Sequence, residues 1–364
     1  LDKKTYNDAT FRAKLKDAVT SLHTGSVWDT DNVIGPMITN DNEKLLHAVE
    51  QLEEGESWLV PPVFADEKRY ILKPCVKWGV KPGNYTFQTE LFAPLLSVVS
   101  IENLKQGIRY ANSTEYGLTS GLQSLDDKEM TLWKDSLEAG NLYINRGITG
   151  AIVGRQPFGG MKRSAFGVGI KAGGPNYVSC FVEFDERETP KLPPVAEYPF
   201  KNYLPKESDQ VRLQYASQSY PQAWKEEFSV ERDGSLIIGE LNTFRYLPLK
   251  SMAIRLLDED NLCDALLTIY AASFTKAKTT VSLSASHPHR KTIQEAVLAF
   301  GNIQISVQEE SLFVGENGQI FPWNRLLISV LRTINGRWQL IFERTGFYKL
   351  FFKKFPLLAV QLQV

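Results

Sequence analysis

The sequence predicts an α/β protein with two domains, and three observations support this class. Its 364 residues are enough for two domains. In both halves, short apolar runs typical of strands alternate with amphipathic segments typical of helices, which is the pattern of parallel β-α-β units. Between the halves lies a charged, proline-rich stretch at 185–203, which is typical of an extended linker or arm.

Composition and charge narrow the class of protein. Hydrophobic residues make up 43% and charged residues 23% of the chain, as in globular proteins. Because the net charge is only −1, we expect neither nucleic acid nor an anionic membrane as a partner. No apolar run approaches the ~20 residues of a membrane helix. The three cysteines, Cys75, Cys180 and Cys263, form no CxxC pair, which favours a reducing compartment and a cytoplasmic protein.

The first half contains the predicted helices and strands of one α/β domain. Apolar residues recur at three- and four-residue spacing in four predicted helices, at 4–23, 43–52, 101–112 and 127–139. We expect Asn40 or Asp41 to cap the second helix and Asp126 the fourth. Short apolar runs predict strands at 58–63, 70–76, 95–101, 116–124 and 141–144, with a turn at 81–84.

The second half repeats the alternation in a compact β-α-β-α-β unit. We expect strands at 251–256, 280–284 and 303–307, one helix capped by Asp258 and reaching about Ser273, and another at 289–300. This is the doubly wound, Rossmann-like pattern of nucleotide-binding domains, but no GxGxxG phosphate loop is present. We therefore assign it no nucleotide and expect a lid or oligomerisation role. Further strands are predicted at 312–314, 338–342 and 357–364.

A glycine-rich stretch from Gly140 to Phe184 is the most distinctive part of the chain. Ten glycines lie between Gly140 and Gly174, a density that indicates sharp turns or a close approach of the backbone to another group. The loops TGAIVG (149–154) and PFGG (157–160) flank the apolar pair Ile152–Val153, which we expect to be buried. Loops of this kind bind ligands with main-chain N–H groups.

Four motifs carry a family resemblance. TELFAPLL (89–96), ANSTEYGLTSGL (111–122), GNLYIN (140–145) and RQPFGG (155–160), in this order and at this spacing, resemble the second half of an NAD(P)-dependent aldehyde dehydrogenase. TGAIVGRQPFGG with KAGGPNY (171–177) more narrowly resembles the glutamate-semialdehyde (pyrroline-5-carboxylate) dehydrogenases, either standalone or as the C-terminal module of proline utilization A. GELNTFRYLP (239–248) resembles the C-terminal extension of some members.

The resemblance implies a domain division and a reaction. Residues 1–184 would be part of the catalytic domain of the aldehyde dehydrogenase fold, 185–203 a linker, and 204–364 a second α/β domain. In the family a cysteine thiolate attacks the aldehyde, a hydride passes to NAD⁺, and water activated by a glutamate hydrolyses the thioester. Neither Cys75 nor Cys180 matches the surroundings of that nucleophile.

We therefore expect a C-terminal fragment that is inactive by itself and assign it no catalytic residue. The nucleophile and the general base both precede the region that the family motifs represent. The whole protein is expected to bind NAD and an aldehyde substrate that carries a carboxylate, here L-glutamate γ-semialdehyde in proline catabolism, and to form a homo-oligomer. A proline dehydrogenase is a possible fused or associated partner.

The resemblance also assigns roles to individual residues. Glu90 would accept hydrogen bonds from both hydroxyls of the nicotinamide ribose, and Phe92 would pack near the nicotinamide ring. The amides of Gly150 and Ala151 would bind the α-carboxylate of the substrate, and Phe158 would contact its aliphatic stem. Without the resemblance, these residues are read as a solvated glutamate, a core aromatic, a plain turn and a packing residue of the PFGG turn.

Other polar residues are assigned no role. We expect Arg155, Arg163 and Lys171 to be solvated surface charges, and Gly160 and Ser164 to be structural. His287 and His289 lack a third ligand nearby, so no metal is expected. Two alternative functions remain open at this point. One is a dehydrogenase for another aldehyde, which the TGAIVG motif makes less favoured. The other is a non-catalytic structural or assembly module.

Overall fold

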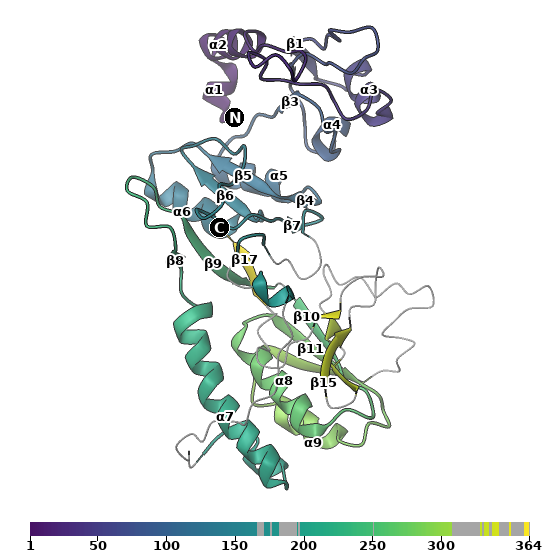
Figure 1. The fold of residues 1–364 in the computed structure, drawn as a ribbon, viewed down its shortest axis with the longest axis vertical. Coiled ribbons are helices and arrows are strands. Elements are labelled where there is room, and N and C mark those ends of the chain that lie inside the picture. Colours follow the sequence, from purple (N-terminus) through teal and green to yellow (C-terminus); the bar gives the residue numbers. More distant parts are fainter. Residues whose placement is uncertain are drawn as a thin grey trace. The chain divides into compact units, whose positions relative to one another are not determined.

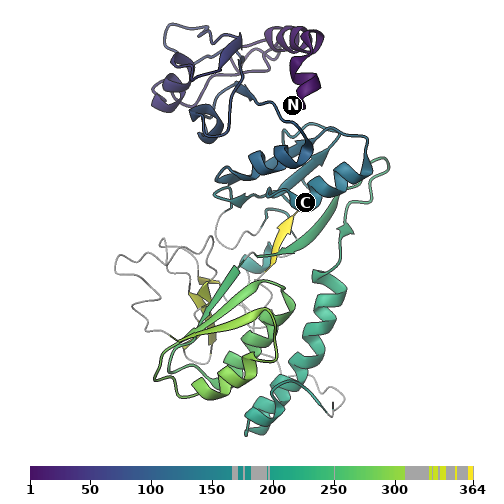
Figure 2. The same ribbon diagram turned by 180° about the vertical axis from the view of Figure 1, so that it is seen from behind.

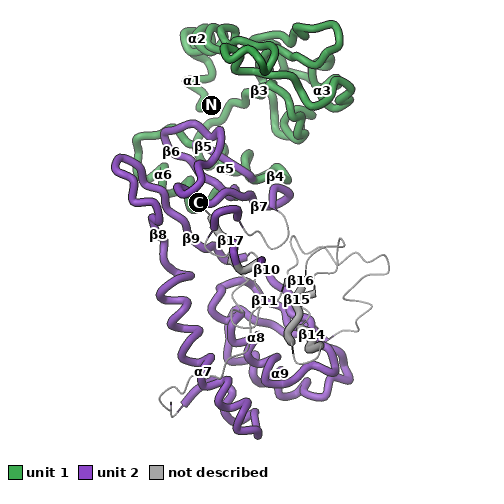
Figure 3. Tube along the Cα trace, in the orientation of Figure 1, with its two compact units in different colours: residues 1–117, 122–138 green, residues 118–121, 139–364 purple. Residues whose placement is uncertain are grey.

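The structure, a computed structural model, describes residues 1–165, 171–174, 177–181, 195, 197–249 and 251–307, and strands between 328 and 363. The chain forms two compact units, which are described separately (Figure 3). The first unit comprises Leu1–Gly117 and Leu122–Glu138. The second comprises Leu118–Gly121 and Ala139–Val364.

A three-stranded sheet forms the centre of the first unit. Its strands are β1 (Ser57–Val60), β2 (Cys75–Trp78) and β3 (Leu95–Val98), in the order β1-β2-β3. β2 and β3 are parallel, but β1 and β2 are antiparallel, so the expectation of parallel strands is wrong for β1. The connection from β1 to β2 contains no helix and folds back on itself through an antiparallel bridge between Phe64 and Leu72, so the chain returns beside β1 and does not cross over the sheet.

Helices cover this sheet, and their ends are set by caps. The predicted helix 4–23 is two helices, α1 (Lys3–Asn7) and α2 (Ala9–Thr20), because the Asp8 carboxylate accepts hydrogen bonds from Thr10 N and Phe11 N and starts a new helix. α2 lies beside β1 and packs on the sheet through Phe11 among others (Figure 2).

The other elements of the first unit follow the predicted order with shifted ends. The helices are α3 (Glu43–Glu50), α4 (Tyr85–Gln88), α5 (Leu104–Asn112) and α6 (Asp127–Ser136), and a short strand is β4 (Tyr116–Gly117). Asp126 caps α6 as predicted, whereas the cap of α3 is Asn42 rather than Asn40 or Asp41. The single-turn helix α4 follows the predicted turn at 81–84 and was not expected.

The second unit begins with the short strands that carry the glycine-rich loops. β5 (Thr119–Leu122), of which all but Leu122 belongs to this unit, pairs with β6 (Asn141–Ile144), which has the predicted bounds. β7 (Met161–Lys162) and the 3₁₀ helix η1 (Val178–Phe181) follow. Much of the predicted linker at 185–203 lies outside the described residues. The end of the predicted linker is described: Phe200 is buried in the core of this unit, directly before η2 (Lys201–Tyr203).

A parallel sheet forms the core of the second unit, and its order is β12-β11-β10-β13 (Figure 1). The strands are β10 (Ser251–Arg255), β11 (Lys278–Leu283), β12 (Ile303–Val307) and β13 (Ile328–Ser329). Helices α8 (Leu262–Phe274) and α9 (Arg290–Val297) lie side by side in the crossovers. Asn261, not Asp258, caps α8, because its side chain accepts from Cys263 N and Asp264 N.

The remaining elements extend this unit. Helix α7 (Glu207–Ala223) continues into a π-helical turn, η3 (Trp224–Phe228), and packs against α8 through an ion pair of Arg212 with Asp264 at 2.6 Å. The other strands are β8 (Arg232–Asp233), β9 (Thr243–Pro248), β14 (Leu331–Ile334), β15 (Arg337–Ile341), β16 (Lys349–Leu350) and β17 (Val360–Gln363). β17 pairs with β9 in antiparallel register. The predicted strand at 312–314 lies outside the described residues. Within the described residues, no helix is both long and apolar enough to cross a membrane.

We expect the second unit to lose stability in mild acid through His287. This buried imidazole accepts a hydrogen bond from His289 N at 3.2 Å, and burial lowers its pKa, although Asp258 opposes the shift. A lowered pKa keeps the ring neutral in the fold, so stability is lost as the pH falls from about 6.5 through the pKa of the folded state. Urea unfolding of the chain at pH 7.5 and 5.5 measures this loss. His287→Gln should reduce the difference between the two midpoints, whereas an unchanged difference would contradict the assignment.

Candidate functional site

The glycine-rich loop after β6 is held by the strand itself. Tyr143 on β6 donates its hydroxyl hydrogen to Gly150 O at 3.0 Å, and Gln156 Nε2 donates to the Tyr143 hydroxyl at 2.9 Å. Burial raises the pKa of Tyr143, so the phenol keeps the proton that it donates. These contacts fix the carbonyl side of Gly150 against β6.

The N–H groups of the same turn are open. Gly150 has φ +152°, a conformation that L-residues rarely adopt, and an added Cβ there would meet no atom within 4 Å. Among the described residues, no group accepts a hydrogen bond from the amide of Gly150 or Ala151. Two consecutive N–H groups that have no acceptor in the described part of the chain can bind an anion such as a carboxylate.

Phe158 lies at the other end of this loop with its ring half-buried. Its backbone forms an antiparallel bridge with Ala172, with N–O distances of 3.0 and 3.1 Å. The neighbouring turn is fixed by Asn141, whose side chain donates to Pro157 O at 2.9 Å and accepts from Gly159 N at 3.1 Å. Since a Cβ on Gly140 would lie 1.9 Å from Gly159 O, only glycine permits this close approach.

Three expectations for this region are wrong. Lys171 is not a surface charge: it is 1% exposed, inside the turn. Ile152 and Val153 are not buried but 50% and 99% exposed. Arg155 is not simply solvated but forms an ion pair with Glu240 at 3.0 Å.

In the first unit, Glu90 and Phe92 flank a buried leucine. Leu91 lies in the core with residues of α3, so its two neighbours point outward. Glu90 is exposed, and Phe92 is 71% exposed, which excludes the core-aromatic interpretation of its ring. Phe92 also has φ +51°, and a bulky residue in that region is strained, as residues at ligand sites often are.

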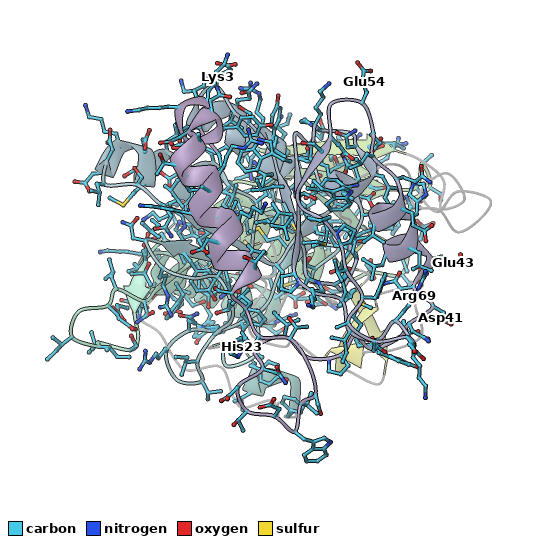
Figure 4. The ribbon with its side chains drawn as sticks, turned by 90° about the horizontal axis from the view of Figure 1, so that it is seen from above. Lys3, His23, Asp41, Glu43, Glu54 and Arg69 are labelled. Atoms are coloured by element: carbon cyan, nitrogen blue, oxygen red, sulfur yellow. The ribbon has the colours of Figure 1, made fainter. Side chains whose placement is uncertain are left out.

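Glu90 and Phe92 line an open hollow of about 430 Å³ at the start of α3. The other lining residues are Asp41, Asn42, Glu43 and Lys44. Figure 4 shows Asp41 and Glu43 at the same edge of the first unit, with Arg69 nearby. Asn42 joins the two walls, because its side chain donates to Leu91 O at 2.9 Å and accepts from Leu45 N at 3.2 Å. Sequence reasoning missed Asn42, although its position just before an apolar helix was a signal.

Asn42→Ala removes the N-cap of α3 and leaves Leu91 O without its donor. We therefore expect it to loosen the Glu90–Phe92 segment and to lower the free energy of unfolding of the first unit by about 1–2 kcal/mol. Guanidinium unfolding measures the loss. Asn42→Asp is the control: it loses the donor to Leu91 O but keeps the capping acceptor, now a carboxylate, which is favourable at a helix N-terminus, so it should cost less. Equal effects of the two substitutions would contradict the role of the cap.

The predicted site residues thus form two groups. Gly150, Ala151 and Phe158 lie on one loop of the second unit, and Glu90 and Phe92 lie in the first. The Cys75 and Cys263 thiols are buried, and burial raises the pKa of each to about 12. The side chain of Cys180 lies outside the described residues. In the described part of the chain, no three His, Cys, Asp or Glu residues gather where they could hold a metal ion.

Comparison with known proteins identifies the family. The model of the aldehyde dehydrogenase family matches residues 2–186, about half of the chain, so the chain belongs to this family. Two relatives from Bacillus subtilis carry a more specific name. 1-Pyrroline-5-carboxylate dehydrogenase 2 is 34% identical over 154 residues, and 1-pyrroline-5-carboxylate dehydrogenase is 34% identical over 159 residues. These alignments cover 42% and 43% of this chain and 30% of each relative.

A solved structure extends the likeness beyond the family match. Proline utilization A from Corynebacterium freiburgense is similar to this chain with a TM-score of 0.66 and 33% sequence identity, over 83% of this chain and 32% of that protein. The α/β class and the aldehyde dehydrogenase fold are therefore confirmed. The chain spans about a third of the length of the proteins that it matches.

Proposed function

We propose that this chain supplies the substrate anchor and part of the cofactor site of an NAD-dependent dehydrogenase that oxidises L-glutamate γ-semialdehyde to glutamate. The observation that carries the proposal is the pair of open amides at Gly150 and Ala151, on a loop fixed by Tyr143. The names of the similar proteins, 1-pyrroline-5-carboxylate dehydrogenase and proline utilization A, support the same substrate.

The two open amides donate to the α-carboxylate of the substrate, and Phe158 packs against its aliphatic stem. A substrate held at both points presents its aldehyde in one orientation, which lowers the entropic part of the barrier. A bulky side chain at position 150 would exclude the carboxylate, which explains a glycine there.

Glu90 and Phe92 fit the nicotinamide end of NAD. The exposed carboxylate has two oxygens for the two ribose hydroxyls, and the exposed ring, in its strained conformation, offers a flat apolar surface in the same hollow. NAD, when bound, accepts the hydride that the substrate loses.

We expect this chain by itself to be inactive. The attacking group in such a reaction is a thiolate. Cys75 and Cys263 are buried, and a thiol with a pKa of about 12 stays protonated near neutral pH. The residues described here therefore bind and orient the reactants.

The other assignments remain part of the proposal. They are the division into residues 1–184, 185–203 and 204–364, homo-oligomerisation, a cytoplasmic location and a fused or associated proline dehydrogenase. The ion pair between Arg155 and Glu240 supports a lid role for the last segment, because it joins the anchor loop to residue 240. Binding of NAD to residues 204–364 alone would contradict that role.

The gene product that contains this sequence, assayed with NAD⁺, tests the proposal. We expect kcat/KM for L-glutamate γ-semialdehyde to exceed that for pentanal, an uncharged aldehyde of similar length, by roughly a hundredfold, since the anchor binds only the former. Equal values would indicate a dehydrogenase for another aldehyde. No oxidation of either would favour a structural module.

A further inference from the structure

Lys171 has a buried amino group that contacts neutral oxygens, and burial lowers its pKa to about 7. Its Nζ donates to Gly140 O at 2.6 Å, to Gly159 O and to Asn141 Oδ1 at 3.4 Å. In the part of the chain that the structure describes, no carboxylate pairs with it. Burying an ammonium group without a counter-ion is unfavourable, so this arrangement needs an explanation beyond stability.

The three oxygens come from both sides of the substrate loop. Gly140 immediately precedes β6, Asn141 is its first residue, and Gly159 lies in the PFGG turn. Residue 172, next to Lys171, pairs with Phe158 through the backbone. One amino group therefore joins β6, the turn and Lys171 itself, which follows the loop.

The two ends of the loop are thus both attached to β6. Tyr143 holds Gly150 at one end, and Lys171 with Asn141 holds Gly159 at the other. Between these attachments lie the open amides and Phe158, which contact opposite ends of the proposed substrate. Nζ has three N–H donors when it is protonated and two when it is neutral, so below its pKa of about 7 it can donate to all three oxygens.

We infer that Lys171 is a positioning residue for substrate specificity, an inference that rests on the proposed function. Lys171 sets the spacing between Phe158 and the Gly150–Ala151 amides, and this spacing makes the loop select ligands with an α-carboxylate. It touches neither substrate nor cofactor. Lys171 acts through the shape of the loop that contacts the substrate.

The test measures selectivity in the full chain with two ligands. L-Glutamate carries the α-carboxylate, and 4-aminobutyrate is the same molecule without it. NMR titrations give a dissociation constant for each ligand. We expect the dissociation constant of 4-aminobutyrate to exceed that of L-glutamate by roughly tenfold or more in the unaltered chain, and this ratio measures the selectivity. Lys171→Met keeps the apolar stem and removes the N–H donors, and should bring the ratio close to one. Circular dichroism establishes that the variant is folded.

Arg163→Met is the matched control, because it removes an exposed positive charge from the same region. It should leave the ratio unchanged. A ratio that falls equally in both variants would show a general electrostatic effect and overturn the inference. If Lys171→Met does not fold, Asn141→Ser takes its place, since it removes the amide that joins Lys171 to the turn.

The outcomes separate the inference from the proposed function. If the unaltered chain binds both ligands equally, the proposed anchor fails. If the unaltered chain discriminates and Lys171→Met discriminates just as well, the anchor stands and the positioning role of Lys171 is overturned.

Discussion

Replacing Lys77 with methionine is expected to destabilise the first unit by about 3–5 kcal/mol, the usual effect of breaking a buried ion pair. The side chains of Lys77 and Glu56 are 2% and 0% exposed, with Nζ and Oε2 3.2 Å apart. Lys77 also donates to Gln51 O at 2.9 Å and lies over the ring of Trp58. The variant would leave the Glu56 carboxylate buried beside methionine, with Glu53 N as its donor. Guanidinium unfolding followed by tryptophan fluorescence measures the effect.

The double variant Lys77→Met with Glu56→Leu is the control. Replacing both partners by apolar groups removes the uncompensated charge, so we expect it to recover most of the lost stability. A single variant within about 1 kcal/mol of the unaltered chain would show that the pair is solvated, as exposed pairs are.

Gly150→Ala is expected to weaken L-glutamate binding about thirtyfold, which corresponds to about 2 kcal/mol. An L-residue at φ +152° is strained, so the turn must shift and its two amides lose their alignment. The added methyl group also enters the open space where the carboxylate would lie. Calorimetric titration of the chain with L-glutamate measures the change.

Gly154→Ala is the matched control for this variant. Gly154 lies in the same loop, has φ +81°, and also has no atom within 4 Å of an added Cβ. The substitution also places an L-residue at a positive φ, but away from the two amides, so we expect at most about a threefold loss of affinity. Equal losses in the two variants would mean that general disruption of the loop, rather than the amide pair, explains the result.

Local signals predicted the elements that depend on nearby residues. β6 has the predicted bounds, and α6 begins where Asp126 caps it, because both follow from short-range patterns. The errors in the first unit came from competing local and long-range effects. Asp8 reads as one polar residue within an amphipathic helix, but its carboxylate starts a second helix. The direction of β1 depends on how the chain returns to the sheet, which periodicity does not encode.

In the candidate site, too, the sequence predicted the features that depend on nearby residues and missed one that depends on distant residues. The glycine pattern and the family motifs indicated Gly150, Ala151 and Phe158, because glycine spacing reflects local backbone geometry. The sequence alone predicts a surface charge at Lys171, since most lysines are exposed. Its burial depends on the close approach of Gly140 to Gly159, a contact between residues far apart in the chain.

The amide chemical shifts of the ¹⁵N-labelled chain during titration with L-glutamate test the central proposal most directly. If the loop binds the α-carboxylate, the resonances of Gly150 and Ala151 shift more than any others, and 4-aminobutyrate leaves them in place. The largest shifts elsewhere in the chain, or the same shifts with both ligands, would contradict an α-carboxylate anchor at these two residues.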